Sequence, residues 1–299
     1  MQSTGKGWTR SSVALPRHLV KNVPKLKNIR RIRSLIGDPS IHTVCESASC
    51  PNIGECFAKN TLTFMILGDI CTRNCRYCGV KHGRPMPLDS KEPERISQAA
   101  AKLGLDYVVI TSVTRDDLPD GGAGQFAAVI KKLWDMNNKL RIEVLIPDFQ
   151  GDAKPLRTVL AARPTVLNHN VETMPRLYSE IRPQADYQRS LKLLRQAKEL
   201  QNDIYTKSGF MVGLGESRAE VFQVITDLKK SGCDIVTIGQ YLAPGKGQVP
   251  VARYIRPEEY DEFQVFGQSL GLKVIAGPFV RSSYHAKDSF EDYNEIRTG

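Results

Sequence analysis

The sequence lacks long apolar runs and low-complexity tracts. No stretch approaches the roughly 20 apolar residues that a membrane-spanning helix needs, and the N-terminus lacks the apolar core of a secretory signal. Glycine and proline, with 23 and 17 of 299 residues, are too few for a collagen-like or wholly disordered chain. We therefore expect a globular protein that does not associate with membranes and stays in the compartment where it folds.

Acidic residues are scarce at the N-terminus. Residues 1–40 hold nine lysines and arginines but one acid, Asp38, whereas the rest of the chain is nearly neutral, although the formal net charge is +10. The basicity therefore belongs to an N-terminal arm and does not by itself indicate nucleic-acid binding. We expect a cytoplasmic protein, or one of an organelle matrix if the basic start is the remnant of a targeting segment.

After the arm, short β-branched or apolar runs alternate with longer amphipathic segments, which is typical of repeated βα units. The expected strands are 61–67, 107–111, 141–146, 165–169, 205–212 and 234–239. The expected helices are 93–103, 123–138, 152–162, 186–201, 217–230 and 257–271. Ser217 and Glu220 form a capping-box pattern at the start of the fifth helix. Such alternation predicts a full or partial (β/α) barrel or a doubly wound sheet, with functional residues in the loops that follow the strands.

Six of the seven cysteines form two triplets: Cys45, Cys50 and Cys56, spaced Cx4Cx5C, and Cys71, Cys75 and Cys78, spaced Cx3Cx2C. A protein of this size without an export signal has little need of disulfides. Structural zinc sites usually use paired CxxC spacings, and only the last two cysteines offer one. Two thiolate triplets fit iron–sulfur clusters better, each leaving one iron without a cysteine ligand. Zinc sites and redox disulfides are the alternatives. Cys233 stands alone and is expected to be a buried small residue.

The second triplet, with Tyr77 before its last cysteine and a predicted strand before its first, resembles the radical S-adenosylmethionine (SAM) superfamily. The resemblance implies that Cys71, Cys75 and Cys78 hold a [4Fe-4S] cluster whose fourth iron binds SAM. The stretch GFMVGLGE at 209–216 is similar to the family's fifth-strand motif. By the same resemblance, the SAM-contact residues are Tyr77, Asn170, Glu172, Met211 and Glu216. Strand-core and turn roles are the alternative for the last four, and His169 is the one histidine with a possible functional place, at a strand end.

The first triplet and RSSYHA at 281–286 narrow the resemblance to the lipoyl synthase family. Further similar stretches are TRDDLPDGGA (114–123), NHNVET (168–173), SGFMVGLGE (208–216) and GPFVRSSYHA (277–286). The resemblance implies a second, auxiliary [4Fe-4S] cluster held by Cys45, Cys50, Cys56 and a serine hydroxyl. That serine is Ser283, with Ser282 as the alternative. Arg281 and His285 are candidates for orienting this ligand loop or for surface roles.

The resemblance also implies the reaction. SAM is cleaved to a 5′-deoxyadenosyl radical, which removes hydrogen from an octanoyl chain on a carrier protein, and the auxiliary cluster gives sulfur to C6 and C8. The implied partners are octanoylated lipoyl domains of 2-oxoacid dehydrogenase complexes, glycine cleavage H protein, a donor such as ferredoxin or flavodoxin, and an iron–sulfur carrier, but no nucleic acid. The alternatives are a biotin-synthase-like or methylthiotransferase radical SAM enzyme, and a metal-containing module that binds nucleic acid through the arm.

These observations together predict an α/β fold, a partial (β/α)6 TIM-like barrel with extensions at both ends of the chain that close its mouth. Residues 1–60 are expected to form the arm that carries the auxiliary-cluster cysteines, residues 61–272 the barrel, and residues 273–299 a tail with the RSSY ligand motif. The arm is expected to fold back over the mouth, where its basic charge would meet an acidic carrier surface or balance cluster charge.

Overall fold

A computed structural model describes residues 15–21 and 24–298, so the first 14 residues of the predicted arm lie outside it. Seven strands form one parallel sheet, and they follow one another across it in chain order. These are β2 (Thr63–Ile66), β5 (Tyr107–Ser112), β6 (Arg141–Leu145), β7 (Val166–Asn168), β8 (Tyr205–Val212), β9 (Ile235–Gln240) and β10 (Lys273–Gly277). A doubly wound sheet would reverse its strand order. The uninterrupted order therefore confirms the barrel-like alternative.

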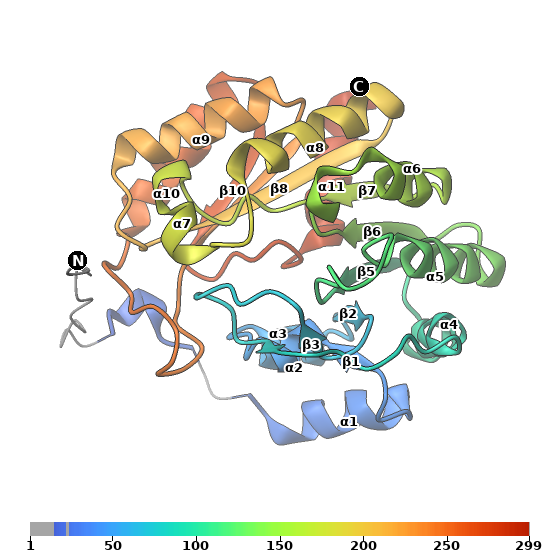
Figure 1. The fold of residues 1–299 in the computed structure, drawn as a ribbon. Coiled ribbons are helices and arrows are strands. Elements are labelled where there is room, and N and C mark those ends of the chain that lie inside the picture. Colours follow the sequence, from blue (N-terminus) through green and yellow to red (C-terminus); the bar gives the residue numbers. More distant parts are fainter. Residues whose placement is uncertain (1–14, 22–23, 299) are drawn as a thin grey trace, which may run out of the picture.

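The helices between these strands cover the outer face of the sheet, as Figure 1 shows. They are α4 (Glu92–Leu103), α5 (Ala123–Met136), α6 (Ala153–Ala161), α8 (Tyr187–Leu200), α9 (Arg218–Lys230) and α10 (Pro257–Ser269). A short helix, α7 (Tyr178–Ile181), follows β7. All six predicted helices and all six predicted strands are present, and their bounds agree to within two residues. The capping box at Ser217 and Glu220 is formed. Within the described residues, no helix is long and apolar enough to cross a membrane.

The sheet is open because its edge strands do not pair with each other. β1 (His42–Thr43) runs antiparallel to β2 at one edge, and β10 pairs with β9 at the other. The sequence prediction placed residues 273–277 in the tail, whereas they form this seventh parallel strand. The barrel is therefore partial, and it has a seam between β1 and β10.

Of the described arm residues, those before β1 lie along the seam and do not cover the mouth. At its start, a ring nitrogen of His18 lies 3.1 Å from the carbonyl oxygen of Ile255, and the Lys21 ammonium lies over the Phe279 ring, both near the β10 edge. Beyond it, α1 (Leu26–Ile36) packs outside the barrel against α3 (Ile53–Ala58) and α4. Only the segment that follows β1 turns toward the mouth.

The C-terminal helix α11 (Ala286–Thr298) closes the end of the barrel opposite the mouth. The Phe290 ring packs against Tyr107 and Tyr205, with ring centroids 6.0 and 5.0 Å apart, and these tyrosines are the first residues of β5 and β8. Strand N-termini are the end away from the functional loops in such barrels. The tail therefore has two parts: residues 280–283 line the mouth, and α11 fills the opposite end.

Candidate active site

A cavity of about 450 Å³ lies at the carboxyl ends of the strands, where the fold predicts function. Its lining brings the two predicted cysteine triplets together. We call it the main cavity, and the predicted site residues in its lining are Cys45, Cys50, Cys71, Cys75, Tyr77, Cys78, Asn170, Glu172, Met211, Ser282 and Ser283. Two of the predicted residues, Cys56 and Glu216, lie outside this lining.

The second triplet lies in the loop that joins two short strands, β3 (Ile70–Cys71) and β4 (Lys81–His82). Backbone amides donate to its sulfurs: those of Arg73 and Thr114 to Cys71 Sγ at 3.4 and 3.3 Å, and that of Val80 to Cys78 Sγ at 3.4 Å. Such donors stabilise negative charge on sulfur and tune the potential of a cluster bound there. The loop is therefore built to hold thiolates.

The first triplet follows β1 through two short helices, α2 (Val44–Ser47) and α3. Thr43 caps α2, its hydroxyl accepting from the amide of Glu46, and the amide of Cys50 donates to the carbonyl of Cys45 at 3.0 Å. Burial is the main cause that raises the thiol pKa of Cys45 to about 12 and that of Cys56 to about 11. Without a metal these side chains are neutral thiols, because only a bound cation would favour the thiolate in such surroundings.

The donor set fits iron–sulfur clusters better than a single metal ion. Within residues 15–21 and 24–298, no group of three His, Cys, Asp or Glu side chains is placed to hold one ion. In a four-iron cluster each cysteine binds a different iron, so a triplet leaves one iron without a cysteine, whereas a structural zinc ion usually takes four protein ligands. Two cysteine triplets therefore match two clusters in number.

Residues 280–283 pass close to β8 and β9 at two glycines. A Cβ at Gly239 would collide with the carbonyl oxygen of Val280, and one at Gly209 would collide with Thr237 and lie 3.0 Å from Ser282 Oγ. Ser282 Oγ donates to Asn170 Oδ1 at 2.7 Å. The Ser283 hydroxyl makes no hydrogen bond to any described residue. The two predicted serines therefore differ in their surroundings, and Ser283 stays the predicted ligand.

The residues expected to contact SAM lie on the β7 and β8 side of the main cavity. Glu172 has a positive φ of 64°. Its backbone amide donates to the carbonyl of Gly209 at 3.0 Å, and its carbonyl accepts from the amide of Met211 at 2.9 Å. Its Oε1 accepts from Asn170 Nδ2 at 3.0 Å, and burial raises its pKa. A strained, polar, well-supported residue facing a cavity is typical of a ligand site.

Glu216 differs from the expectation. Its carboxylate accepts from the amides of Gly213 and Leu214 at 2.6 and 2.8 Å, so it closes the turn after β8 and does not reach the main cavity. The Glu216 carboxylate lies two to three residues after these amides, so it can accept from them within the turn itself.

Sequence reasoning missed two buried arginines that line the main cavity. Arg73, 4% exposed, donates to both oxygens of Asp116 (2.6 and 2.9 Å) and to Asp148 (2.6 Å). Arg182 donates to the carbonyls of Asn170 and Val171, at 3.2 Å each. The partners of Arg73 lie far away in the sequence, and those of Arg182 lie in the preceding loop, so the loops were recognisable as functional but the pairings were not.

His169, the candidate histidine, lines the main cavity in its neutral form. Burial lowers its pKa to about 4, and Nδ1 lies 2.8 Å from the carbonyl of Ile146, which fixes the proton on Nδ1. Nε2 is a buried acceptor without a partner among the described residues. Such an orphaned acceptor fits a polar ligand in the main cavity.

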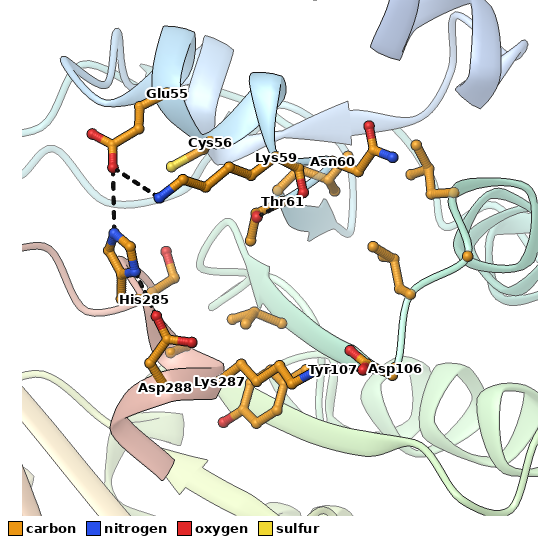
Figure 2. Close-up of a pocket in the computed structure, with 17 residues that line it drawn as sticks. Glu55, Cys56, Lys59, Asn60, Thr61, Asp106, Tyr107, His285, Lys287 and Asp288 are labelled. Atoms are coloured by element: carbon orange, nitrogen blue, oxygen red, sulfur yellow. Dashed lines mark hydrogen bonds and ion pairs between the residues drawn. The ribbon is translucent and has the colours of Figure 1, made fainter. Parts of the chain in front are cut away.

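One carboxylate joins the arm, the first triplet and the tail. Glu55, next to Cys56, accepts from Lys21 Nζ at 3.0 Å, from Tyr284 OH at 3.0 and 3.1 Å, and from His285 at 3.3 Å. Figure 2 shows His285 between Glu55 and Asp288, with Lys59 beside them. Because Tyr284 follows Ser283, Glu55 fastens the tail beside Cys56.

Replacement of Glu55 by Gln should make stability less sensitive to acid. Burial raises the pKa of Glu55, but the hydrogen bonds from Lys21, Tyr284 and His285 outweigh it and lower the pKa from 4.5 to about 2. A depressed pKa contributes stability above pH 4.5 that is lost as the pH falls through about 2. Urea unfolding between pH 6 and 2 should show the difference between wild type and E55Q shrinking toward low pH. A constant difference would contradict this role, and Glu262→Gln, at an exposed pair with Arg218, is the control.

Comparisons with known proteins agree with this geometry. The model of the radical SAM superfamily matches residues 65–228. Lipoyl synthase of Caldicellulosiruptor saccharolyticus is 54% identical over 264 residues, 88% of this chain and 93% of that one. Lipoyl synthase of Rubrobacter xylanophilus is 51% identical over 278 residues, 93% of this chain and 87% of that one.

Solved structures support the fold alone. SuiB of Streptococcus suis bound to S-adenosylmethionine has a TM-score of 0.57 at 11% identity, covering 83% of this chain and 59% of that chain. Methylornithine synthase (PylB) has a TM-score of 0.51 at 13% identity, covering 94% and 91%. The identity to the curated relatives over most of both chains is decisive: the chain belongs to the lipoyl synthase family of the radical SAM superfamily.

Proposed function

We propose that the protein inserts sulfur at C6 and C8 of an octanoyl group carried on a protein, which produces the lipoyl group. One observation supports this most strongly: ligand residues for two clusters line a single cavity. Bound there, one [4Fe-4S] cluster supplies the electron that cleaves SAM, and the other supplies sulfur. The biotin-synthase-like and methylthiotransferase alternatives have no support in the family assignment.

On the SAM side, Cys71, Cys75 and Cys78 hold the first cluster. The amides that donate to Cys71 and Cys78 stabilise charge on these sulfurs, and the buried Arg73 holds the loop between the first two cysteines against Asp116 and Asp148. Glu172, held by Asn170, is an acceptor for the ammonium group of SAM, and the neutral His169 offers a second acceptor. Tyr77 and Met211 supply apolar contact surface in the same lining.

On the sulfur side, Cys45, Cys50, Cys56 and Ser283 hold the auxiliary cluster. Serine oxygen is a harder and more basic ligand than thiolate, so it is protonated and released more easily when the cluster must open. Glu55 and Tyr284 keep the tail in place while this happens. The tail and the α2–α3 segment also narrow the mouth, which helps to exclude water from radical chemistry.

The substrate is an octanoylated carrier protein, and the reaction needs a reductant. We assign the carrier to lipoyl domains of 2-oxoacid dehydrogenase complexes and to glycine cleavage H protein, the reductant to a ferredoxin or flavodoxin, and the cluster source to an iron–sulfur carrier. Among the basic residues of the arm, Lys25, Lys27 and Arg30 are exposed and would contact an acidic surface of the carrier. Arg33 instead forms an ion pair with Glu46. The site of action is the cytoplasm, or an organelle matrix.

The test is anaerobic reconstitution followed by assay with SAM, a reductant and an octanoyl-lysine peptide. We expect about eight irons per chain, as two four-iron clusters require, and lipoyl peptide with two added sulfur atoms detected by mass spectrometry. Methylthio product, or stoichiometric zinc in place of iron, would refute the proposal.

A further inference from the structure

A second pocket lies on the other side of the auxiliary-cluster residues. This outer pocket, of about 360 Å³, is formed where the residues before β2 and at the start of β5 face the first turn of α11. Figure 2 shows it between Glu55, Lys59 and Thr61 on one wall and His285, Lys287 and Asp288 on the other. It lies toward the strand N-termini, away from the SAM residues.

The proposed auxiliary ligands are divided between the two spaces. Cys45 and Cys50 line the main cavity, Cys56 lines the outer pocket, and Ser283 lines both. A cluster held by all four must therefore lie between the two spaces, with its Cys56 and Ser283 side toward the outer pocket. In the proposed function SAM and the octanoyl chain occupy the main cavity. The outer pocket therefore reaches the same cluster from the side opposite to them.

We propose that the outer pocket is an exit route through which iron ions leave the auxiliary cluster. This rests on the proposed function, in which that cluster gives up sulfur and its iron must be cleared before an iron–sulfur carrier supplies a new cluster. A separate route would let this iron leave without passing the SAM site.

The chemistry of the pocket wall suits ions better than an apolar ligand. Its rim carries Lys59, Asp106, Lys287 and Asp288, with side chains between 43% and 71% exposed, so the pocket opens to water. Charges of both signs are paired around it: Lys59 with Glu55 along one wall, and Lys287 of α11 with Asp106 before β5. Such a lining stabilises ions of either sign without trapping them, and no described group there is placed to hold a single metal ion. The pocket is thus a passage and not a binding site.

The experiment measures iron loss from the anaerobic holoenzyme to a small ferrous chelator, 2,2′-bipyridine, without reductant. The kinetic phase of iron loss that comes from the auxiliary cluster is called the auxiliary phase. A variant with Cys45, Cys50 and Cys56 changed to Ala identifies it, because only that phase is absent from the variant. SAM and octanoyl peptide together fill the main cavity and should leave this phase nearly unchanged. Thr61→Trp and Lys287→Trp fill the outer pocket from opposite walls, and each should slow it severalfold. Thr158→Trp, on the exposed face of α6, is the matched control and should have no effect.

Iron content and circular dichroism of each variant show that it is folded and loaded before release is measured. Two results would overturn the proposal in favour of release through the main cavity. One is an auxiliary phase that is unchanged in both tryptophan variants that fill the outer pocket, and the other is an auxiliary phase that SAM and peptide suppress. The first turnover of both filled variants should equal wild type, because their clusters are already loaded. Absence of lipoyl product in wild type would refute the proposed function instead, while the iron-release comparison would stand.

Discussion

Ser283→Ala should abolish lipoyl formation while release of 5′-deoxyadenosine from SAM largely survives. The serine lines the outer pocket together with Cys56 and the main cavity together with Cys50, and its hydroxyl bonds to no described residue. Its removal leaves one iron of the auxiliary cluster without its protein ligand, whereas the Cys71, Cys75 and Cys78 site is untouched. Single-turnover assays that quantify both products in the same sample measure the two effects.

Ser282→Ala separates the two neighbouring serines. Its hydroxyl donates to Asn170, so the variant should keep the auxiliary cluster and lose at most some SAM affinity. Ser283→Cys should restore iron content, since thiolate binds iron well, but transfer sulfur poorly because thiolate is released less easily. Normal lipoyl formation in Ser283→Ala together with its loss in Ser282→Ala would show that Ser282 is the ligand.

Lys207→Met should destabilise the protein by about 3–5 kcal/mol, the usual cost of breaking a buried ion pair. Lys207 on β8 and Glu143 on β6, both 1% exposed, pair at 3.1 Å inside the barrel, below the main cavity. Glu143 also accepts from Tyr107 OH at 2.7 Å and Asn168 Nδ2 at 3.0 Å. These neutral donors cannot replace the lost cation. The midpoint of anaerobic urea unfolding of the loaded protein measures the change.

Two further variants show that the effect belongs to the buried charge. Lys207→Met with Glu143→Leu removes both charges and should recover most of the lost stability. Lys132→Met breaks the half-exposed pair with Glu94 and should leave the unfolding midpoint almost unchanged. Equal losses in Lys132→Met and Lys207→Met would contradict this account.

The bounds of the repeated βα units could be predicted because local signals define them. Helix α9 shows this best, since Ser217, Glu220 and the terminal lysines are all local to it. β10 was missed because it has five residues and runs directly into the segment that carries the RSSY motif. A usable signal was present: Gly271, with φ of 71°, ends α10, and Leu272 and Val274 then alternate as in a buried strand.

The candidate site was predictable where spacing carries chemistry. Both cysteine triplets stand out by their spacing, whereas the serine pair was indicated only by the resemblance to a known family. Arg73 and Glu55 could not be identified, since each acts through partners distant in the sequence, and no spacing pattern marks Arg182. Glu216 forms a purely local turn interaction, which agrees with the turn role given as its alternative.

The approach of the tail to two strand glycines has a consequence for the order of assembly. Ser283 follows Cys45, Cys50 and Cys56 far along the chain, so it is translated well after them. Residues 280–283 lie against β8 and β9 at Gly209 and Gly239, so these strands must be in place before the tail can bind there. A nascent chain can therefore present the Cys71, Cys75 and Cys78 triplet well before the proposed auxiliary ligand set is complete.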